Sequence, residues 1–137
     1  MPLSAVDVAR RYFDLQSNGD VEGALGLFAP DARFIAPFGE LPLPEGVRGY
    51  LQGFQVSFPG NGFEVTNVIE QGEQVAIEGY WIGTHSGPMT LPDGSEMAPT
   101  NKRVRAPFVT VFQVRDGTIR EHRGYWDMAG FMAQLQA

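Results

Sequence analysis

A hairpin signal late in the chain constrains the fold most. Residues 103–115 and 118–126 are rich in β-branched and aromatic side chains, which favour strands. Between them stand Asp116 and Gly117, a dipeptide typical of a two-residue hairpin turn. Asp127 then precedes a short apolar run, which predicts a capped C-terminal helix. Because that helix would close over the hairpin, the pattern predicts an enclosed space against a sheet.

The earlier part of the chain predicts helices first and strands second. Ser4 and Asp7 have the spacing of a capping box, and the helix after them should end near residues 17–19. A shorter helix follows Asp20, and a third, weakened by glycines, covers residues 45–56. Strands are predicted at 31–37, 63–70 and 74–86, with loops at 38–44 and 87–102.

Composition excludes several classes of function. The chain has 137 residues, enough for one domain with its own core. It has no cysteine, so disulfides and thiolate metal sites are excluded. A net charge of −6 without a basic run argues against nucleic acid. No apolar run is long enough to span a membrane and no secretory signal is present, so we expect a cytoplasmic protein. Two histidines 37 positions apart do not form a metal site, and no cofactor motif is found.

Helices followed by long strands predict an α+β fold, with a curved sheet whose concave face is covered by the helices. Strand alternation decides which side chains face inward. Glycines at 79, 83 and 124 alternate with bulky aromatic residues. They either permit strong curvature or leave space for a ligand, and curvature is the favoured interpretation.

Several segments resemble a known family. They are 83–88 (GTHSGP), 99–104 (PTNKRV), 111–122 (VFQVRDGTIREH) and 125–128 (YWDM), together with an N-terminal pattern over residues 12–34. They look like the SnoaL-like polyketide cyclase branch of the nuclear-transport-factor-two-like superfamily. The resemblance covers nearly all of residues 1–137 as a single domain. It implies a cystatin-like cone, in which three N-terminal helices pack on a strongly curved, mostly antiparallel sheet with a short C-terminal helix.

The same resemblance implies an apolar pocket and often a homodimer, but its catalytic residues do not carry over. Where the ring-closing cyclases have an aspartate and a neighbouring histidine, this chain has Gly124 and Thr110. Where limonene-type epoxide hydrolases have an arginine and two aspartates, it has Gly79, Trp81 and Gly124. A limonene-type epoxide hydrolase is therefore not expected.

Three residues remain as candidate catalytic groups. His85 lies at a strand end, where its imidazole can act as a general base at a pocket mouth or bond the loop backbone. His122 shares a strand face with Gly124 and Trp126, so it can pair with His85, hold a ligand carbonyl or contact a carboxylate on a neighbouring strand. Asp127 is the one acid beside the expected pocket, although helix capping explains it better. Aromatic and hydroxyl residues that form either a ligand-binding wall or plain core are Tyr12, Tyr50, Phe54, Trp81, Thr110, Phe112 and Trp126.

Two functions stay open on the sequence. One is a cyclase or isomerase that acts by proton transfer on a small, flat, apolar ketone or polyketide-like molecule, with His85 or His122 stabilising an enolate. The other is a non-catalytic ligand-binding or structural member of the superfamily, whose pocket has lost its acid and base. The missing interior carboxylate favours the second function. The two histidines and the long loop favour the first.

Overall fold

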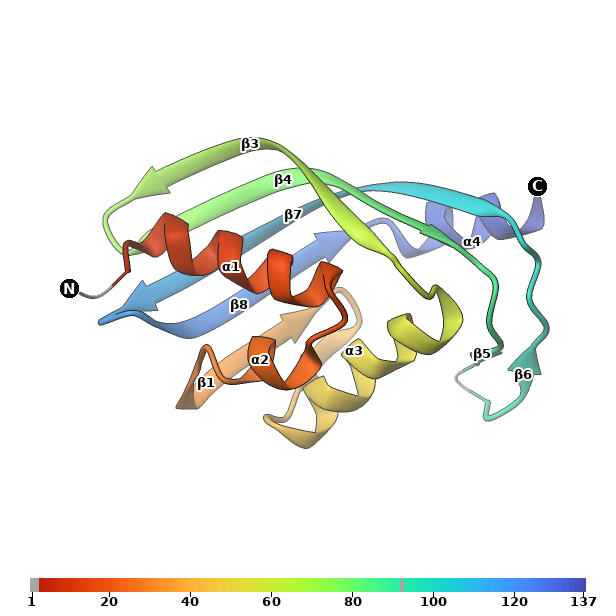
Figure 1. Ribbon diagram of the computed structural model, residues 1–137, viewed down its shortest axis with the longest axis horizontal. Coiled ribbons are helices and arrows are strands. Elements are labelled where there is room, and N and C mark those ends of the chain that lie inside the picture. Colours follow the sequence, from red (N-terminus) through yellow and green to blue (C-terminus); the bar gives the residue numbers. More distant parts are fainter. Residues whose placement is uncertain (1–2, 92) are drawn as a thin grey trace.

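The computed structural model describes residues 3–91 and 93–137, and within them the chain forms four helices and a curved sheet (Figure 1). The main sheet has six strands in the order β2-β1-β8-β7-β4-β3, and β5 and β6 form a separate hairpin. The elements are α1 (Ala5–Ser17), α2 (Val21–Leu25), β1 (Phe28–Ala36), β2 (Gly39–Leu41), α3 (Glu45–Ser57), β3 (Gly62–Gln71), β4 (Gln74–Thr84), β5 (Met89–Thr90), β6 (Glu96–Met97), β7 (Arg103–Arg115), β8 (Thr118–Trp126) and α4 (Met128–Gln136).

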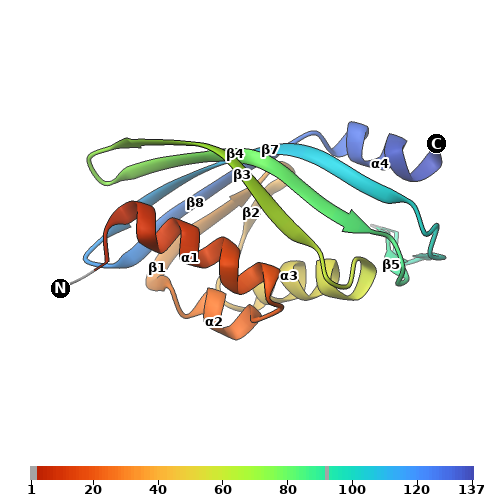
Figure 2. The same ribbon diagram turned by 45° about the horizontal axis from the view of Figure 1, so that its top comes forward.

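The sheet arches over three of the helices. Figure 2 shows α1, α2 and α3 on its concave side, while α4 lies beyond the end of β8, near β7. Neighbouring strands are antiparallel except β1 and β8, which pair in parallel. This arrangement confirms the predicted α+β cone.

The β7–β8 hairpin has the turn that the sequence predicts. Arg115 pairs with Thr118, and the two residues between them, Asp116 and Gly117, have φ of 52° and 77°. Left-handed backbone at both central positions is the type I′ geometry, whose twist matches that of the flanking strands. Inward-facing residues of both arms, such as Thr110 and His122, line a cavity.

The backbones of β3 and β4 approach each other closely at one irregularity. The register between β3 and β4 shifts between Val65 and Asn67, and Gly79 lies opposite this irregularity. A Cβ at position 79 would lie 1.9 Å from the Glu64 carbonyl oxygen, so only glycine lets the two backbones approach this closely. The β3 backbone takes the space beside Gly79, so this glycine leaves no room for a ligand, which agrees with the favoured curvature interpretation.

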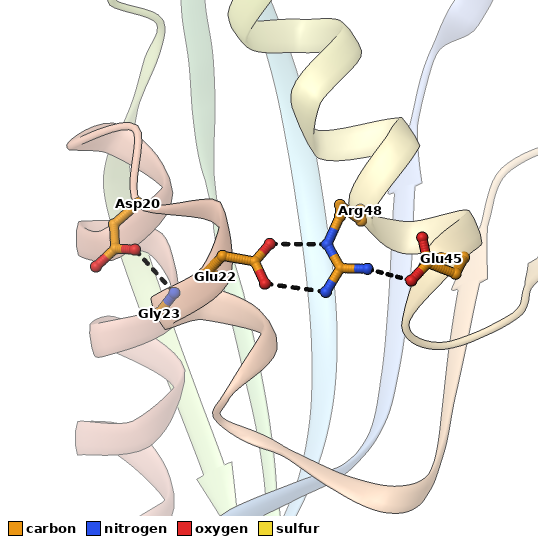
Figure 3. A network of polar contacts seen from close by, with 5 residues as sticks. All are labelled: Asp20, Glu22, Gly23, Glu45 and Arg48. Carbon is orange, nitrogen blue, oxygen red and sulfur yellow. Dashed lines mark hydrogen bonds and ion pairs between the residues drawn. The ribbon is translucent and has the colours of Figure 1, made fainter.

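Capping and one ion-pair network hold the helices in place. Ser4 caps α1 by accepting a hydrogen bond from the Asp7 backbone N–H at 3.2 Å, as predicted. Arg48 of α3 donates two hydrogen bonds to the Glu22 carboxylate of α2, at 2.8 and 2.9 Å, and also pairs with Glu45 (Figure 3). The bidentate geometry fixes the relative orientation of α2 and α3.

Three segments differ from the prediction. The first predicted strand begins earlier, at Phe28, because its start pairs with β8. The predicted loop at 38–44 contains β2, which turns back along the other edge of β1. The predicted loop at 87–102 contains the β5–β6 hairpin, although Pro92 lies outside the described residues. Within the described part of the chain, no helix combines the length and apolar character needed to cross a membrane.

Candidate functional site

A cavity lies between the concave face of the sheet and helices α1, α3 and α4. The cavity volume is about 70 Å³. The unfilled space around it is about 620 Å³, but that figure includes open solvent at the mouth. The 70 Å³ is the volume that compares with known ligand sites, and it is smaller than the roughly 300–1,000 Å³ of typical small-molecule pockets. Its lining residues are Tyr12, Phe13, Gln16, Phe34, Ala36, Pro37, Tyr50, Leu51, Phe54, Phe63, Trp81, Ala106, Phe108, Thr110, His122, Gly124, Trp126 and Phe131.

Aromatic rings make up most of the cavity wall. Ten of the eighteen lining residues are Phe, Tyr or Trp. Many meet edge to face or tilted, such as Tyr50 with Phe54 at 5.1 Å and Trp126 with Phe131 at 5.6 Å between ring centroids. These geometries fix the ring orientations, so the wall offers preformed aromatic faces to a flat ligand.

His122 is the titratable base on this wall. Its ring stacks on Phe34 of the parallel neighbouring strand, with centroids 3.9 Å apart and planes 7° from parallel. The side chain is 6% exposed and its Nδ1 atom has no hydrogen-bond partner among the described residues. Burial lowers the pKa of His122 to about 3, although the backbone at His122 and Ile35 partly opposes the shift. The imidazole is therefore neutral at physiological pH.

Two tyrosines on the wall are also held neutral. Burial, reinforced by the neighbouring Tyr50, raises the pKa of Tyr12 far above its ordinary value. Burial likewise raises the pKa of Tyr50 to about 12, opposed by a side-chain hydrogen bond with Trp126. Both phenols keep their protons near neutral pH and can donate them in hydrogen bonds.

Glycines and one buried amide shape the cavity. Asn61 accepts a hydrogen bond from the Trp81 indole N–H at 3.0 Å, which fixes that ring. A Cβ at Gly83 would lie 2.8 Å from the Trp81 ring, so the ring occupies the space above this glycine. At Gly124 a Cβ would lie 3.0 Å from Cε1 of His122 and would enter the cavity wall. Gly124 therefore fits the alternative to sheet curvature, in which a glycine leaves space beside a ligand pocket.

His85 lies apart from the cavity lining. It is fully buried, and its Nδ1 accepts a hydrogen bond from the Thr100 backbone N–H at 3.2 Å. The His85 backbone also exchanges hydrogen bonds with Lys102 and Asn101. Burial lowers the pKa of His85, with the Gly87 backbone partly opposing. This histidine joins the end of β4 to the end of the loop at 87–102, so it bonds the loop backbone as one of the two sequence interpretations expects.

Two other predicted site residues also lie outside the lining. Asp127 is exposed and caps α4 by accepting a hydrogen bond from the Gly130 N–H at 3.0 Å. Phe112 is fully buried behind the wall, where it packs against Tyr12 and His122. The predicted residues that the fold brings together around the cavity are Tyr12, Tyr50, Phe54, Trp81, Thr110, His122 and Trp126.

Sequence reasoning missed part of the wall. Phe108 shares the inward face of β7 with Thr110, so alternation alone could have found it. Phe34 enters through the parallel pairing of β1 with β8, for which the sequence carries no local signal. Gln16 lies on the buried face of α1, and Phe131 lies on the buried face of α4. No cluster of three potential metal ligands occurs among the described residues.

Known proteins resemble this chain in sequence and in fold. It is 31% identical over 135 residues to the epoxide hydrolase LasB of Streptomyces lasalocidi, a match that covers 92% of this chain and 43% of LasB. The chain therefore spans less than half the length of that relative. IdmH of Streptomyces antibioticus, assigned as a polyketide cyclase, has a similar structure, with a TM-score of 0.82, 26% identity, and coverage of 98% of this chain and 100% of IdmH.

A protein from Jannaschia sp. CCS1, assigned as a SnoaL-like polyketide cyclase, has the same fold, with a TM-score of 0.83 and 24% identity. The match covers 97% of this chain and 92% of the Jannaschia chain. The family model described as a SnoaL-like domain matches residues 9–122. The match runs from α1 to His122 and so includes most of the residues that line the cavity. The chain belongs to the SnoaL-like domain family.

Proposed function

We propose that this chain binds a flat, mainly apolar molecule of ketone or polyketide type in the cavity, without transferring a proton. One observation carries the proposal. Ten aromatic rings surround the space, while His122, its one base among the described lining residues, has a pKa of about 3. A site of this kind offers contact area and hydrogen-bond donors but no group ready to accept a proton.

The lining accounts for recognition in two parts. Aromatic faces such as those of Phe54 and Trp126 suit a planar ring system, because offset and edge-to-face contacts are favourable. The neutral hydroxyls of Tyr12 and Tyr50 suit a carbonyl oxygen, which accepts hydrogen bonds. A mostly apolar pocket with a few convergent polar groups is the usual composition of a small-molecule site.

Proton transfer is less well supported. A general base works best when its pKa is near the working pH, and His122 is far below it. The relative LasB is named an epoxide hydrolase. Opening an epoxide with water requires a group that takes a proton from water, and the described lining has no carboxylate to do so. We therefore do not extend that activity to this chain.

A cyclase or isomerase activity is the second candidate, and the two tyrosines favour it. Neutral phenols that point at a carbonyl oxygen can stabilise the enolate that forms when a neighbouring carbon loses a proton. The assignment of IdmH as a polyketide cyclase agrees with this chemistry. The activity would require a base from the ligand, from solvent or from His122.

One experiment tests binding and catalysis separately. The chain has two tryptophans, Trp81 and Trp126, and both line the cavity. We expect saturable quenching of their fluorescence by cyclic aromatic ketones and polyketide mimics. Exchange of the ketone α-protons for deuterium, followed by NMR, should not be accelerated. Quenching that never saturates would refute binding, whereas accelerated exchange that is lost in Tyr12→Phe and His122→Phe would establish the second candidate.

A further inference from the structure

We propose that the cavity selects its ligand by charge, so that it takes the uncharged form of an oxygen-bearing aromatic molecule and excludes the corresponding anion. The inference rests on the proposed function and adds the protonation state of the ligand to it. It also predicts how the cavity changes the ionisation of a ligand that can itself titrate.

The first support is the kind of side chain on the wall. Among the described lining residues there is no Asp, Glu, Lys or Arg. Two arginines of β7 are paired with acids outside the cavity, Arg105 with Glu64 and Arg115 with Glu73, and these side chains are about half exposed. An anion inside the cavity would therefore lack a compensating cation.

The second support is that no acid among the described residues is packed against the His122 ring, and only the backbone at His122 and Ile35 favours its charged form. The rings packed against it belong to Phe34 and Phe28 of β1, Tyr12 of α1 and Phe112 of β7. None of these side chains carries a charge near neutral pH. The imidazole is more than nine-tenths buried and its Nδ1 has no partner among the described residues, so protonation would leave a buried cation without an acid beside it.

The remaining polar groups fit a neutral oxygen better than an anionic one. Tyr12, Tyr50 and Thr110 contribute hydroxyl groups to the lining, and each hydroxyl can donate one hydrogen bond to a carbonyl. A carboxylate or phenolate would exchange its full hydration shell for a few such bonds in an aromatic enclosure. Burial without an opposite charge disfavours the ionised form by several pKa units.

Two independent measurements report the cost of placing an anion in the cavity. If the neutral form of a ligand binds about 100-fold more tightly than its anion, the pKa of the bound ligand must rise by about two units. The first quantity comes from a pair of ligands with the same shape. The second comes from one ligand that titrates, so the two values check each other.

The test uses three naphthalene probes and the unmodified protein. 2-Acetylnaphthalene and 2-naphthoate have nearly the same shape, because a methyl group replaces one carboxylate oxygen. We expect 2-naphthoate to bind at least about 100-fold more weakly than the ketone at pH 7. We also expect bound 2-naphthol, followed by the absorbance of its anion, to remain protonated up to about two pH units above its pKa in water.

Binding of 2-naphthoate within about tenfold of the ketone, or ionisation of bound 2-naphthol at or below its solution pKa, would overturn the inference. Ionised 2-naphthol in the cavity would instead show that the hydroxyls stabilise an oxyanion. If 2-acetylnaphthalene itself does not bind, the proposed function fails. A titration with this ketone that produces no change in fluorescence identifies that failure directly.

A matched pair of variants at Gln16 places a charge in the wall. Gln16 lies on α1, is 5% exposed and lines the cavity. We expect Gln16→Arg to bind 2-naphthoate at least about tenfold more tightly than Gln16→Met does, because only the first supplies a countercharge. Equal naphthoate affinity in two folded variants would contradict selection by charge. The measurements on the unmodified protein do not depend on either variant.

Discussion

The low pKa of His122 makes the stability of this protein depend on pH in a way that can be calculated. The native imidazole is neutral down to a pKa of about 3, whereas in the unfolded chain it takes up a proton below about pH 6.5. The unfolded state therefore binds more protons as the pH falls, and stability present above pH 6.5 is progressively lost. Between pH 7 and pH 5 this histidine alone should lower the free energy of unfolding by about 2 kcal/mol.

The variant His122→Phe isolates this contribution, because phenylalanine keeps an aromatic ring against Phe34 and cannot titrate. Urea unfolding should be measured at pH 7 and pH 5 for both proteins. The loss of stability should be about 2 kcal/mol smaller in the variant, since all other titrating groups are shared. The matched control His85→Gln should retain the loss that His122 causes. Equal losses in the unmodified protein and His122→Phe would refute a neutral, desolvated His122.

The remaining predictions concern the glycines, the α4 cap and the outer face of the sheet. Gly79→Ala should lower the unfolding free energy by at least about 2 kcal/mol, because its Cβ would meet the backbone of β3. Gly124→Ala should instead weaken ketone binding measured by tryptophan quenching. A Gly79→Ala protein that loses only ketone affinity, or a Gly124→Ala protein that loses only stability, would contradict these assignments. Asp127→Ala should lower the unfolding free energy by about 1 kcal/mol and leave ketone affinity unchanged, whereas lost affinity would place Asp127 in the site. Ile69 and Tyr125 are 59% and 46% exposed, and they alternate with inward-facing neighbours on β3 and β8, which puts both on the convex face. We expect a homodimer through that face. Sedimentation should give a dimer that Tyr125→Lys dissociates, and a monomeric unmodified protein would contradict this.

The fold was largely predictable because its strongest signals are local. The Asp116-Gly117 turn and the alternating arms beside it specify one hairpin and the faces of both strands. Thr110 and Trp126 follow from that alternation, and both line the cavity. Capping by Ser4 and Asp127 was likewise readable from residue type and spacing.

The rest depends on contacts between distant segments. Strand alternation correctly turned Phe112 inward, but it could not show that Tyr12 and His122 pack over it. The sequence placed His85 at a strand end, but the burial of its ring against the loop end depends on where Thr100 returns. The pairing of Phe34 with His122 requires a parallel strand from the other end of the chain. These are tertiary facts, which local periodicity does not encode.

The proposed function requires a flat, uncharged ligand to occupy the aromatic cavity. NMR of the protein saturated with 2-acetylnaphthalene tests it most directly, through nuclear Overhauser contacts between ligand and protein protons. We expect contacts to the Thr110 methyl group and to the rings of Phe54 and Trp126, all of which line the cavity. Contacts confined to Ile69 and Tyr125 on the convex face, or no contacts at saturation, would contradict it.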